Sequence, residues 1–132
     1  KLPFADETFD IIINPISNHY IDNIDYLFTE IYRVLKKGGK FIAGLETEIY
    51  WTINNETHCL ENKLPFNPLK DKKLLNQLIN EGNAIQFSHT TVEQIKGQLK
   101  AGFIIKDIFE DTEKGIFKNL NISTSIGTLS IK

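Results

Sequence analysis

The feature that most constrains the fold is a strand–helix–strand pattern over residues 9–45. Residues 9–14 form a short apolar run without polar alternation, which is typical of a parallel strand covered on both faces. Apolar residues then recur at intervals of three and four from Ile24 to Leu35, as on one face of an amphipathic helix. Residues 40–45 repeat the buried-strand pattern. Together the three elements predict a βαβ unit with parallel strands and a right-handed crossover.

Both ends of this helix carry local signals. Asp22 or Asn23 can cap its first turn. The lysines at positions 36–37 are expected in its last turn, where cations suit the helix dipole, and the glycines at positions 38–39 can supply a left-handed cap. The helix is therefore expected to continue as far as residue 37.

A long excursion separates this unit from the rest of the predicted core. Residues 46–88 mix aromatic residues, polar residues and prolines around one short helical pattern at 71–81. Connections of this length are uncommon in a compact domain unless they form a lid or a binding segment. Residues 46–88 are therefore predicted to be a lid or substrate insertion.

Three further elements close the predicted domain. The pattern Thr90-x-x-Glu93 is a capping box that opens a helix. Residues 103–109 predict a strand. Residues 122–131 alternate with period two after a turn over 111–115, which favours antiparallel pairing near a sheet edge.

Composition excludes several classes of protein. The 132 residues, 41% hydrophobic, suit one domain, and a net charge of −2 gives no bias toward nucleic acid or an anionic membrane. No apolar run approaches the roughly 20 residues of a membrane-spanning helix. The single Cys59 excludes an intramolecular disulfide, so a reducing cytoplasm is the expected location. The His and Cys residues lack the spacing of metal ligands, so no metal site is expected.

Two features of the start of the chain are interpreted together. The chain contains no Met and begins at Lys1. No glycine-rich turn follows the first predicted strand, where a nucleotide-binding α/β fold uses backbone N–H groups to approach its ligand. We therefore expect a truncated domain whose cofactor-binding half lies before Lys1.

Two motifs resemble those of a known family. Residues 2–12 read LPFADETFDII, and residues 30–41 read EIYRVLKKGGKF. They are similar to the LPF-x-D-x-(S/T)-FD and E-x-x-RVLKPGG-x-(F/L) segments of class I S-adenosylmethionine-dependent methyltransferases of type 11, with Lys37 in place of the usual proline. The resemblance is close over residues 2–45 and loose over the whole chain. It implies the C-terminal half of a Rossmann-like methyltransferase fold, an α/β domain whose mixed sheet combines parallel strands with a terminal antiparallel strand.

The resemblance also implies a function. The parent protein would transfer a methyl group from S-adenosylmethionine to a small-molecule acceptor. Residues 1–132, as one partial domain, would bind this cofactor weakly or not at all and would be inactive alone. Loss of the preceding strands would expose the edge of residues 9–13, so self-association is expected through that edge or through helix faces that the missing part would cover. The alternative is a noncatalytic, methyltransferase-like binding or dimerisation module.

Four residues are candidates for cofactor binding through this resemblance. Leu2 would lie at the adenine edge, or else would anchor its loop by apolar contact. Asn14, Pro15 and Ile16 leave the carboxyl end of the first strand, where open α/β sheets bind ligands and where the family binds the methionine part of the cofactor. Asn14 is equally explained as a turn former before the proline.

The next residues would face the transferred methyl group. Ser17 and Tyr20 are candidate substrate residues, and His19 is the candidate catalytic residue. Methyl transfer from a sulfonium is an in-line displacement that depends on alignment and exclusion of water. An imidazole can accept a proton from an attacking O–H or N–H group near neutral pH. The alternative is that His19 caps the next helix or hydrogen-bonds within its loop.

Further polar and aromatic residues complete the candidates. Glu46 and Trp51 follow the second strand, and His89 precedes the last helix, so all three are predicted substrate contacts. Trp51 is alternatively a loop anchor. Two glutamines, Gln94 and Gln98, share one helix face and are expected to be solvated. Glu30 and Arg33 are expected to form a surface ion pair.

Overall fold

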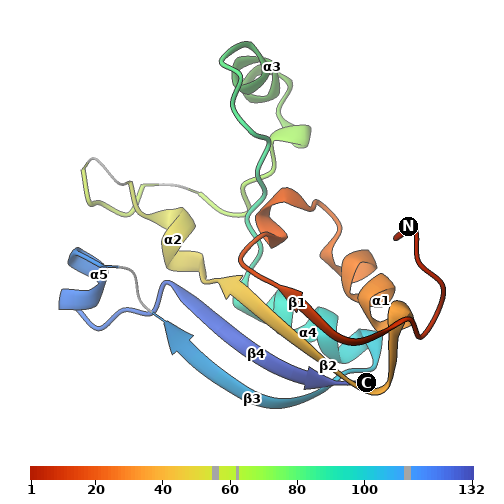
Figure 1. Ribbon diagram of the computed structural model, residues 1–132. Helices are drawn as coiled ribbons and strands as arrows, with labels where there is room; N and C mark the ends of the chain where they lie inside the picture. Colours follow the sequence, from red (N-terminus) through yellow and green to blue (C-terminus); the bar gives the residue numbers. More distant parts are fainter. Residues whose placement is uncertain (55–56, 62, 112–113) are drawn as a thin grey trace.

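The structure of the protein, a computed structural model, describes residues 1–54, 57–61, 63–111 and 114–132. Its elements are β1 (Phe9–Asn14), the 3-10 helix η1 (Asn18–Tyr20), α1 (Ile24–Val34), β2 (Leu35–Glu46), α2 (Glu48–Thr52), the 3-10 helix η2 (Pro68–Lys70), α3 (Lys72–Asn80), α4 (Thr91–Ala101), β3 (Ile104–Asp111), α5 (Ile116–Asn119) and β4 (Ser125–Ile131). The strands form one mixed sheet in the order β1-β2-β4-β3 (Figure 1).

The parallel pairing of β1 and β2 around α1 confirms the predicted βαβ unit. Ile12 lies opposite Phe41 in the parallel register. The apolar face of α1 covers this pair, with Phe28 fully buried and its ring 6.1 Å from that of Phe41. Burial of one such phenylalanine stabilises the fold by about 2–3 kcal/mol. At the start of α1, the side chain of Asn23 accepts a hydrogen bond from the N–H of Tyr26, which confirms the predicted cap.

The predicted end of this helix is wrong. α1 ends at Val34, and β2 begins at the next residue, so the lysines at 36–37 belong to a strand. Lys36 pairs with Asp10 of β1 at 2.9 Å instead of meeting a helix terminus. Gly38 has a φ of +73° within β2, and its N–H donates to the carbonyl of Lys132. Strand partners on both sides satisfy this backbone, which explains why the helix stops early.

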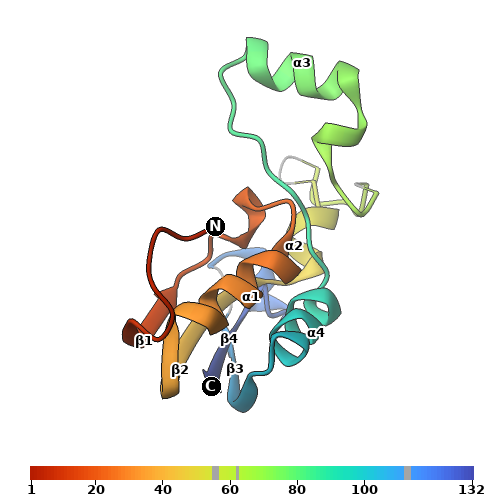
Figure 2. The ribbon, with the colours of Figure 1, turned by 90° about the vertical axis from the view of Figure 1, so that its right-hand side faces the viewer.

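The other helix, α4, packs beside α1 on the same face of the sheet (Figure 2). Thr90 and Glu93 form the predicted capping box. Gly102 ends the helix in the left-handed conformation, with a φ of +107°. The two helices approach closely at Gly97, because a Cβ there would lie 2.7 Å from the Phe28 ring.

The prediction that two glutamines of α4 are solvated is wrong. Gln94 and Gln98 are 2% and 0% exposed. The amide of Gln98 exchanges hydrogen bonds with the hydroxyl of Thr128 and accepts one from Ser130. The period-two alternation of β4 therefore presents hydroxyls to a buried amide, since every polar group removed from water needs a partner.

The C-terminal strand is antiparallel, as predicted, but it lies inside the sheet. β4 pairs with β2 on one side and with β3 on the other, so the edge is β3. The strand begins at Ser125, and the short helix α5 precedes it where the sequence predicts no helix. Within the predicted turn over 111–115, residues 112–113 lie outside the described residues.

The opposite edge strand, β1, is covered on one face only. Ile11 and Ile13 are 56% and 66% exposed, which contradicts the prediction of a strand covered on both faces. Both helices that pack on the sheet, α1 and α4, lie on the same side of it (Figure 2). Among the described residues, β1 therefore has an apolar outer face and pairs with a strand, β2, on one side alone.

The excursion over residues 46–88 contains the predicted short helix. Asp71 caps α3 by accepting hydrogen bonds from two N–H groups of its first turn. Residues of α3 are not buried, and the helix stands away from the sheet (Figures 1 and 2). In the part of the chain that the structure describes, no helix is long and apolar enough to cross a membrane.

The α1–α4 contact predicts an unusual sign for a glycine-to-alanine change. In an exposed helix this replacement stabilises by about 1 kcal/mol. In Gly97→Ala, the new Cβ would press on the buried Phe28 ring and lie 3.0 Å from the Asp25 carboxylate. We expect the free energy of unfolding in urea to fall by about 1–3 kcal/mol. Lys96→Ala, on the exposed side of α4, is the control and should change it by less than about 0.5 kcal/mol. A stabilised Gly97→Ala protein would contradict the close packing.

Candidate functional site

A small crevice lies where the parallel strands β1 and β2 end. The loop that follows β1 meets the end of β2, the start of α2 and the segment that leads into α4. The lining residues are Ile16, Asn18, His19, Gly44, Glu46, Trp51, Phe87, His89 and Gln94. We call this the His19 crevice. Its volume of about 10 Å³ leaves room for no more than a single water molecule.

A chain of side-chain hydrogen bonds holds the loop after β1 in place. The hydroxyl of Ser17 donates to the Asn14 amide oxygen at 2.6 Å, and the Asn14 amide donates to Asn18 at 2.7 Å. Asn18 donates to Gln94 at 3.0 Å, and Gln94 donates to the backbone carbonyl of Glu46 at 2.9 Å. The chain joins the ends of β1 and β2 to α4, which makes the crevice rigid.

Sequence reasoning missed two members of this chain. Asn18 and Gln94 are 4% and 2% exposed, although their residue types suggest a surface position. The spacing of Asn14 and Asn18, four residues apart around a proline, is the one local signal that could have linked them. Gln94 is joined to them by tertiary structure alone. The side-chain amide of Asn14 is engaged on both sides, by Ser17 and by Asn18.

The central contact of the crevice joins His19 to Glu46. Nδ1 of the imidazole lies 3.1 Å from a carboxylate oxygen of Glu46, and each side chain is 12% exposed. An ionised carboxylate only accepts hydrogen bonds, so the neutral imidazole carries its proton on Nδ1 and its lone pair on Nε2. Among the described residues, none forms a hydrogen bond with Nε2. The geometry presents a basic nitrogen that is held in one tautomer.

Aromatic side chains surround the His19 ring. The Tyr20 ring lies 4.1 Å from it, and the Trp51 ring 6.0 Å. Trp51 is also stacked on Phe66, which belongs to the same excursion, with an interplanar angle of 18°. Tyr20 is 51% exposed.

Hydrogen bonds hold the two ends of the outer part of the excursion together next to the crevice. The N–H of Phe87 donates to the His19 carbonyl at 2.7 Å. Phe66 and Ser88 are joined by two hydrogen bonds, one from the Ser88 N–H to the Phe66 carbonyl and one from the Phe66 N–H to the Ser88 hydroxyl. The segment between them, which includes α3, projects outward. The side chains that cover the crevice and the projecting helix α3 thus belong to the same insertion.

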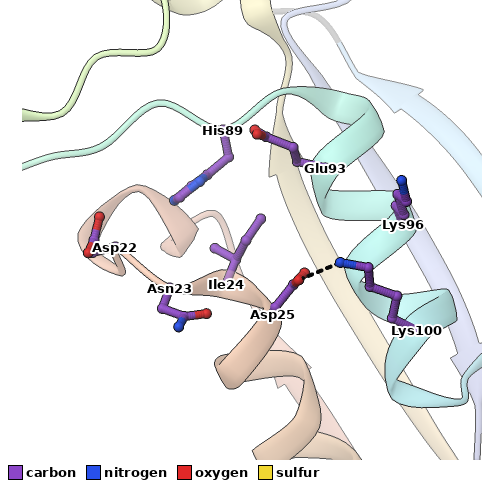
Figure 3. Close-up of a pocket in the computed structure, with 8 residues that line it drawn as sticks. All are labelled: Asp22, Asn23, Ile24, Asp25, His89, Glu93, Lys96 and Lys100. Carbon is purple, nitrogen blue, oxygen red and sulfur yellow. Dashed lines mark hydrogen bonds and ion pairs between the residues drawn. The ribbon is translucent and has the colours of Figure 1, made fainter.

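A wider groove of about 440 Å³ lies between the start of α1 and α4 (Figure 3). Nε2 of His89 donates to the Ile21 carbonyl at 2.7 Å, so this ring fixes the segment before α4 to the end of η1. Asp25 and Lys100 pair across the groove at 2.7 Å with both side chains more than half exposed. A solvent-exposed ion pair, whose two charges neutralise each other, is weak evidence for a ligand-binding site. The smaller His19 crevice is therefore the candidate site.

Glu48 connects the insertion to α4. Its carboxylate accepts hydrogen bonds from the N–H and the hydroxyl of Thr91, at 2.8 and 2.7 Å. Burial raises the pKa of Glu48, but the hydrogen bonds outweigh it and the net pKa is lowered. The ionised carboxylate thus sits at the first turn of α4, where negative charge suits the helix dipole.

Leu2 lies apart from the crevice, and its position depends on Glu30 and Arg33. The Leu2 N–H donates to Glu30 at 2.8 Å, and the Arg33 guanidinium donates to the carbonyls of Leu2 and Phe4 and to Asp6. Glu30 is 7% exposed, so the prediction of a surface pair is wrong. Two parallel hydrogen bonds from Arg33, followed by the bond from Leu2, lower the pKa of Glu30 to about 2.

Metal binding has no geometric support in the described ranges. Among residues 1–54, 57–61, 63–111 and 114–132, no group of three or more His, Cys, Asp or Glu side chains could hold a metal ion.

Comparison with known proteins shows similarity to methyltransferases. A model of the methyltransferase domain matches residues 1–43. The chain is 32% identical over 136 residues to the uncharacterized methyltransferase YbaJ of Bacillus subtilis (strain 168), which covers 98% of the chain and 53% of that relative. The chain is thus similar to a methyltransferase over nearly its whole length. It spans about half the length of this relative.

Other relatives agree with this methyltransferase assignment. The chain is 43% identical over 63 residues to the sterol 4-C-methyltransferase strm-1 of Caenorhabditis elegans, over 48% of the chain and 17% of that protein. The crystal structure of an S-adenosylmethionine-dependent methyltransferase from Mesorhizobium loti superposes with a TM-score of 0.73 at 16% identity, over the whole chain and 65% of its own. The predicted Rossmann-like methyltransferase fold is confirmed.

The Glu30–Arg33 pair predicts how the stability of this chain responds to acid. The pKa of the Glu30 carboxyl is lowered from 4.5 to about 2 in the folded protein. Its contribution to stability is therefore present above the unfolded pKa and is lost as the pH falls from 4.5 toward 2. We expect the urea midpoint to fall more between about pH 5 and 2.5 in the wild type than in Glu30→Gln. Glu110→Gln, on an exposed strand position, should keep the wild-type slope. Equal slopes in the wild type and Glu30→Gln would refute the role of this carboxyl.

Proposed function

We propose that the protein containing this chain is an S-adenosylmethionine-dependent methyltransferase that acts on a small-molecule acceptor. One observation carries the proposal. The two family motifs lead into β1 and β2, and the carboxyl ends of these parallel strands hold the His19 crevice. Ligands of open α/β sheets bind at this end.

The residues present would contact one side of the methyl donor. Beside the crevice, a shallow groove of about 160 Å³ is lined by Asn14, Pro15, Ile16 and Gly44. Ligand pockets usually measure about 300–1,000 Å³, so this groove fits part of a donor and requires further chain to complete it. A Cβ at Gly44 would lie 3.0 Å from Ile16, so the glycine lets the loop pass close to β2. S-adenosylmethionine, when bound, supplies a methyl group activated by a sulfonium.

The acceptor side is assigned to the aromatic and polar residues of the His19 crevice. Tyr20 and Trp51 would contact the acceptor, and Ser17 would hold the loop through Asn14. The covering segment over residues 46–88 would act as a lid, because a void of one water molecule admits no acceptor until its aromatic side chains move aside. Leu2, held at its backbone by the Glu30–Arg33 pair, would meet the adenine end of the donor.

Donor binding provides the first test. We expect the full-length protein to bind S-adenosylhomocysteine in calorimetric titration, and residues 1–132 alone to bind it at least about 100-fold more weakly, because the glycine-rich turn is absent from these residues. Ile16→Asp should weaken binding by the full-length protein, since it places a charge in the groove. Ile104→Asp, at another exposed isoleucine on the far edge strand, 57% against 45% exposed, is the control. Tight binding by residues 1–132 alone would contradict the shared site. No binding by the full-length protein would favour the noncatalytic module.

The free edge of β1 predicts the behaviour of residues 1–132 in isolation. We propose that they self-associate, because Ile11 and Ile13 expose apolar surface beside unpaired strand backbone. In analytical ultracentrifugation, Ile13→Lys should shift the species toward monomer. Val92→Lys, on an exposed position of α4, should not. A wild-type monomer at high concentration would contradict the proposal.

A further inference from the structure

We propose that His19 and Glu46 form a proton-accepting dyad that directs methyl transfer to acceptors whose nucleophile still carries a proton, a hydroxyl or an amine. In this dyad His19 is the catalytic residue and Glu46 is a positioning residue. The inference rests on the proposed methyltransferase function and adds the chemical class of the acceptor to it.

The geometry assigns different roles to the two side chains. Glu46 holds Nδ1 of His19 at 3.1 Å and leaves the lone pair of Nε2 as the available base. The backbone of both residues is fixed independently, because the His19 carbonyl accepts from Phe87 and the Glu46 carbonyl accepts from Gln94. The imidazole is therefore held by the Glu46 carboxylate of β2, while the insertion holds the backbone of His19 and α4 holds the backbone of Glu46.

The second histidine of the crevice provides an internal contrast. Nε2 of His89 donates to the Ile21 carbonyl at 2.7 Å, so that nitrogen already carries a proton and is engaged. His89 tethers two segments through Nε2, whereas His19 is held through Nδ1 by the Glu46 carboxylate. The two histidines of the crevice are thus held in opposite tautomers, and the one paired with a carboxylate presents its lone pair on Nε2.

A positioned proton acceptor is needed only when the attacking atom of the methyl acceptor still carries a proton. A carboxylate has already lost its proton at neutral pH and needs no base to attack a methyl group. An alcohol, a phenol or an amine needs one, because its proton must leave as the new bond forms. The electron pair of the acceptor O–H or N–H bond becomes the nucleophilic pair, which forms the bond to the methyl carbon. The proton moves to Nε2 of His19, and the carbon–sulfur bonding pair returns to sulfur, so charge and atoms balance.

The first arm of the test measures the tautomer without any acceptor. In ¹⁵N-histidine spectra of the full-length protein, we expect His19 to show the Nδ1–H tautomer. Glu46→Gln should lose this single tautomer, because an amide can donate to Nδ1 as well as accept from it. Glu110→Gln, on the exposed face of β3, should leave the spectrum unchanged. An Nε2–H tautomer of His19 in the wild type would overturn the dyad.

The second arm compares two acceptors of similar shape, phenol and 4-nitrophenol, at about pH 8, where the second is ionised. With phenol, we expect kcat to fall by about 10²–10⁴-fold in His19→Asn and by about 10–100-fold in Glu46→Gln, with KM nearly unchanged. With 4-nitrophenol both losses should be much smaller, a difference that a merely structural role would not produce. Glu110→Gln should retain wild-type rates with both acceptors.

The outcomes separate the dyad from the methyltransferase function itself. Equal losses on the two acceptors, unchanged turnover in both variants, or a wild type that methylates neither phenol nor 4-nitrophenol while it still binds S-adenosylhomocysteine would overturn the dyad and leave the function standing. Failure of the full-length protein to bind S-adenosylhomocysteine would overturn both.

Discussion

The rest of the structure depends on the parallel pairing of β1 and β2. Parallel strands need a crossover, so α1 must pack across them, and its buried Phe28 meets Phe41 of β2. The same pairing brings the carboxyl ends of both strands to one edge of the sheet. Asn14 and Glu46, 32 positions apart, therefore terminate neighbouring strands, and the contact between His19 and Glu46 follows from this arrangement.

Polar groups in this fold are buried in pairs and chains instead of being left in water. Gln98 satisfies two hydroxyls of β4, and the amide chain from Asn14 to Gln94 ends on the Glu46 carbonyl. Glu30 is ionised beneath Arg33 and holds the N-terminal segment against α1. Such satisfied networks fix one relative arrangement of strands and helices, because any displacement leaves a buried polar group without its partner.

Much of the fold could be predicted because its signals are local. Helical spacing defined α1, the Thr90–Glu93 capping box defined the start of α4, and apolar runs defined β1 and β2. The misses have a common cause. Gly38 accommodates an irregularity in β2, yet a glycine after a helical pattern equally describes a helix cap. Ser130 faces a buried amide, yet a strand with alternating serines equally describes a solvated strand face. A local pattern cannot show which partner will satisfy a backbone or hydroxyl group.

The sequence by itself determined the order of elements, the family motifs at residues 2–12 and 30–41, and the location of most candidate residues at strand ends. Tertiary structure alone decided what those residues do. It paired His19 with Glu46, engaged His89 at the Ile21 carbonyl and joined Asn18 to Gln94 across 76 positions. The physical reason is that propensity and capping act within a few residues, whereas a hydrogen bond between distant side chains exists only after the sheet and helices have brought them together.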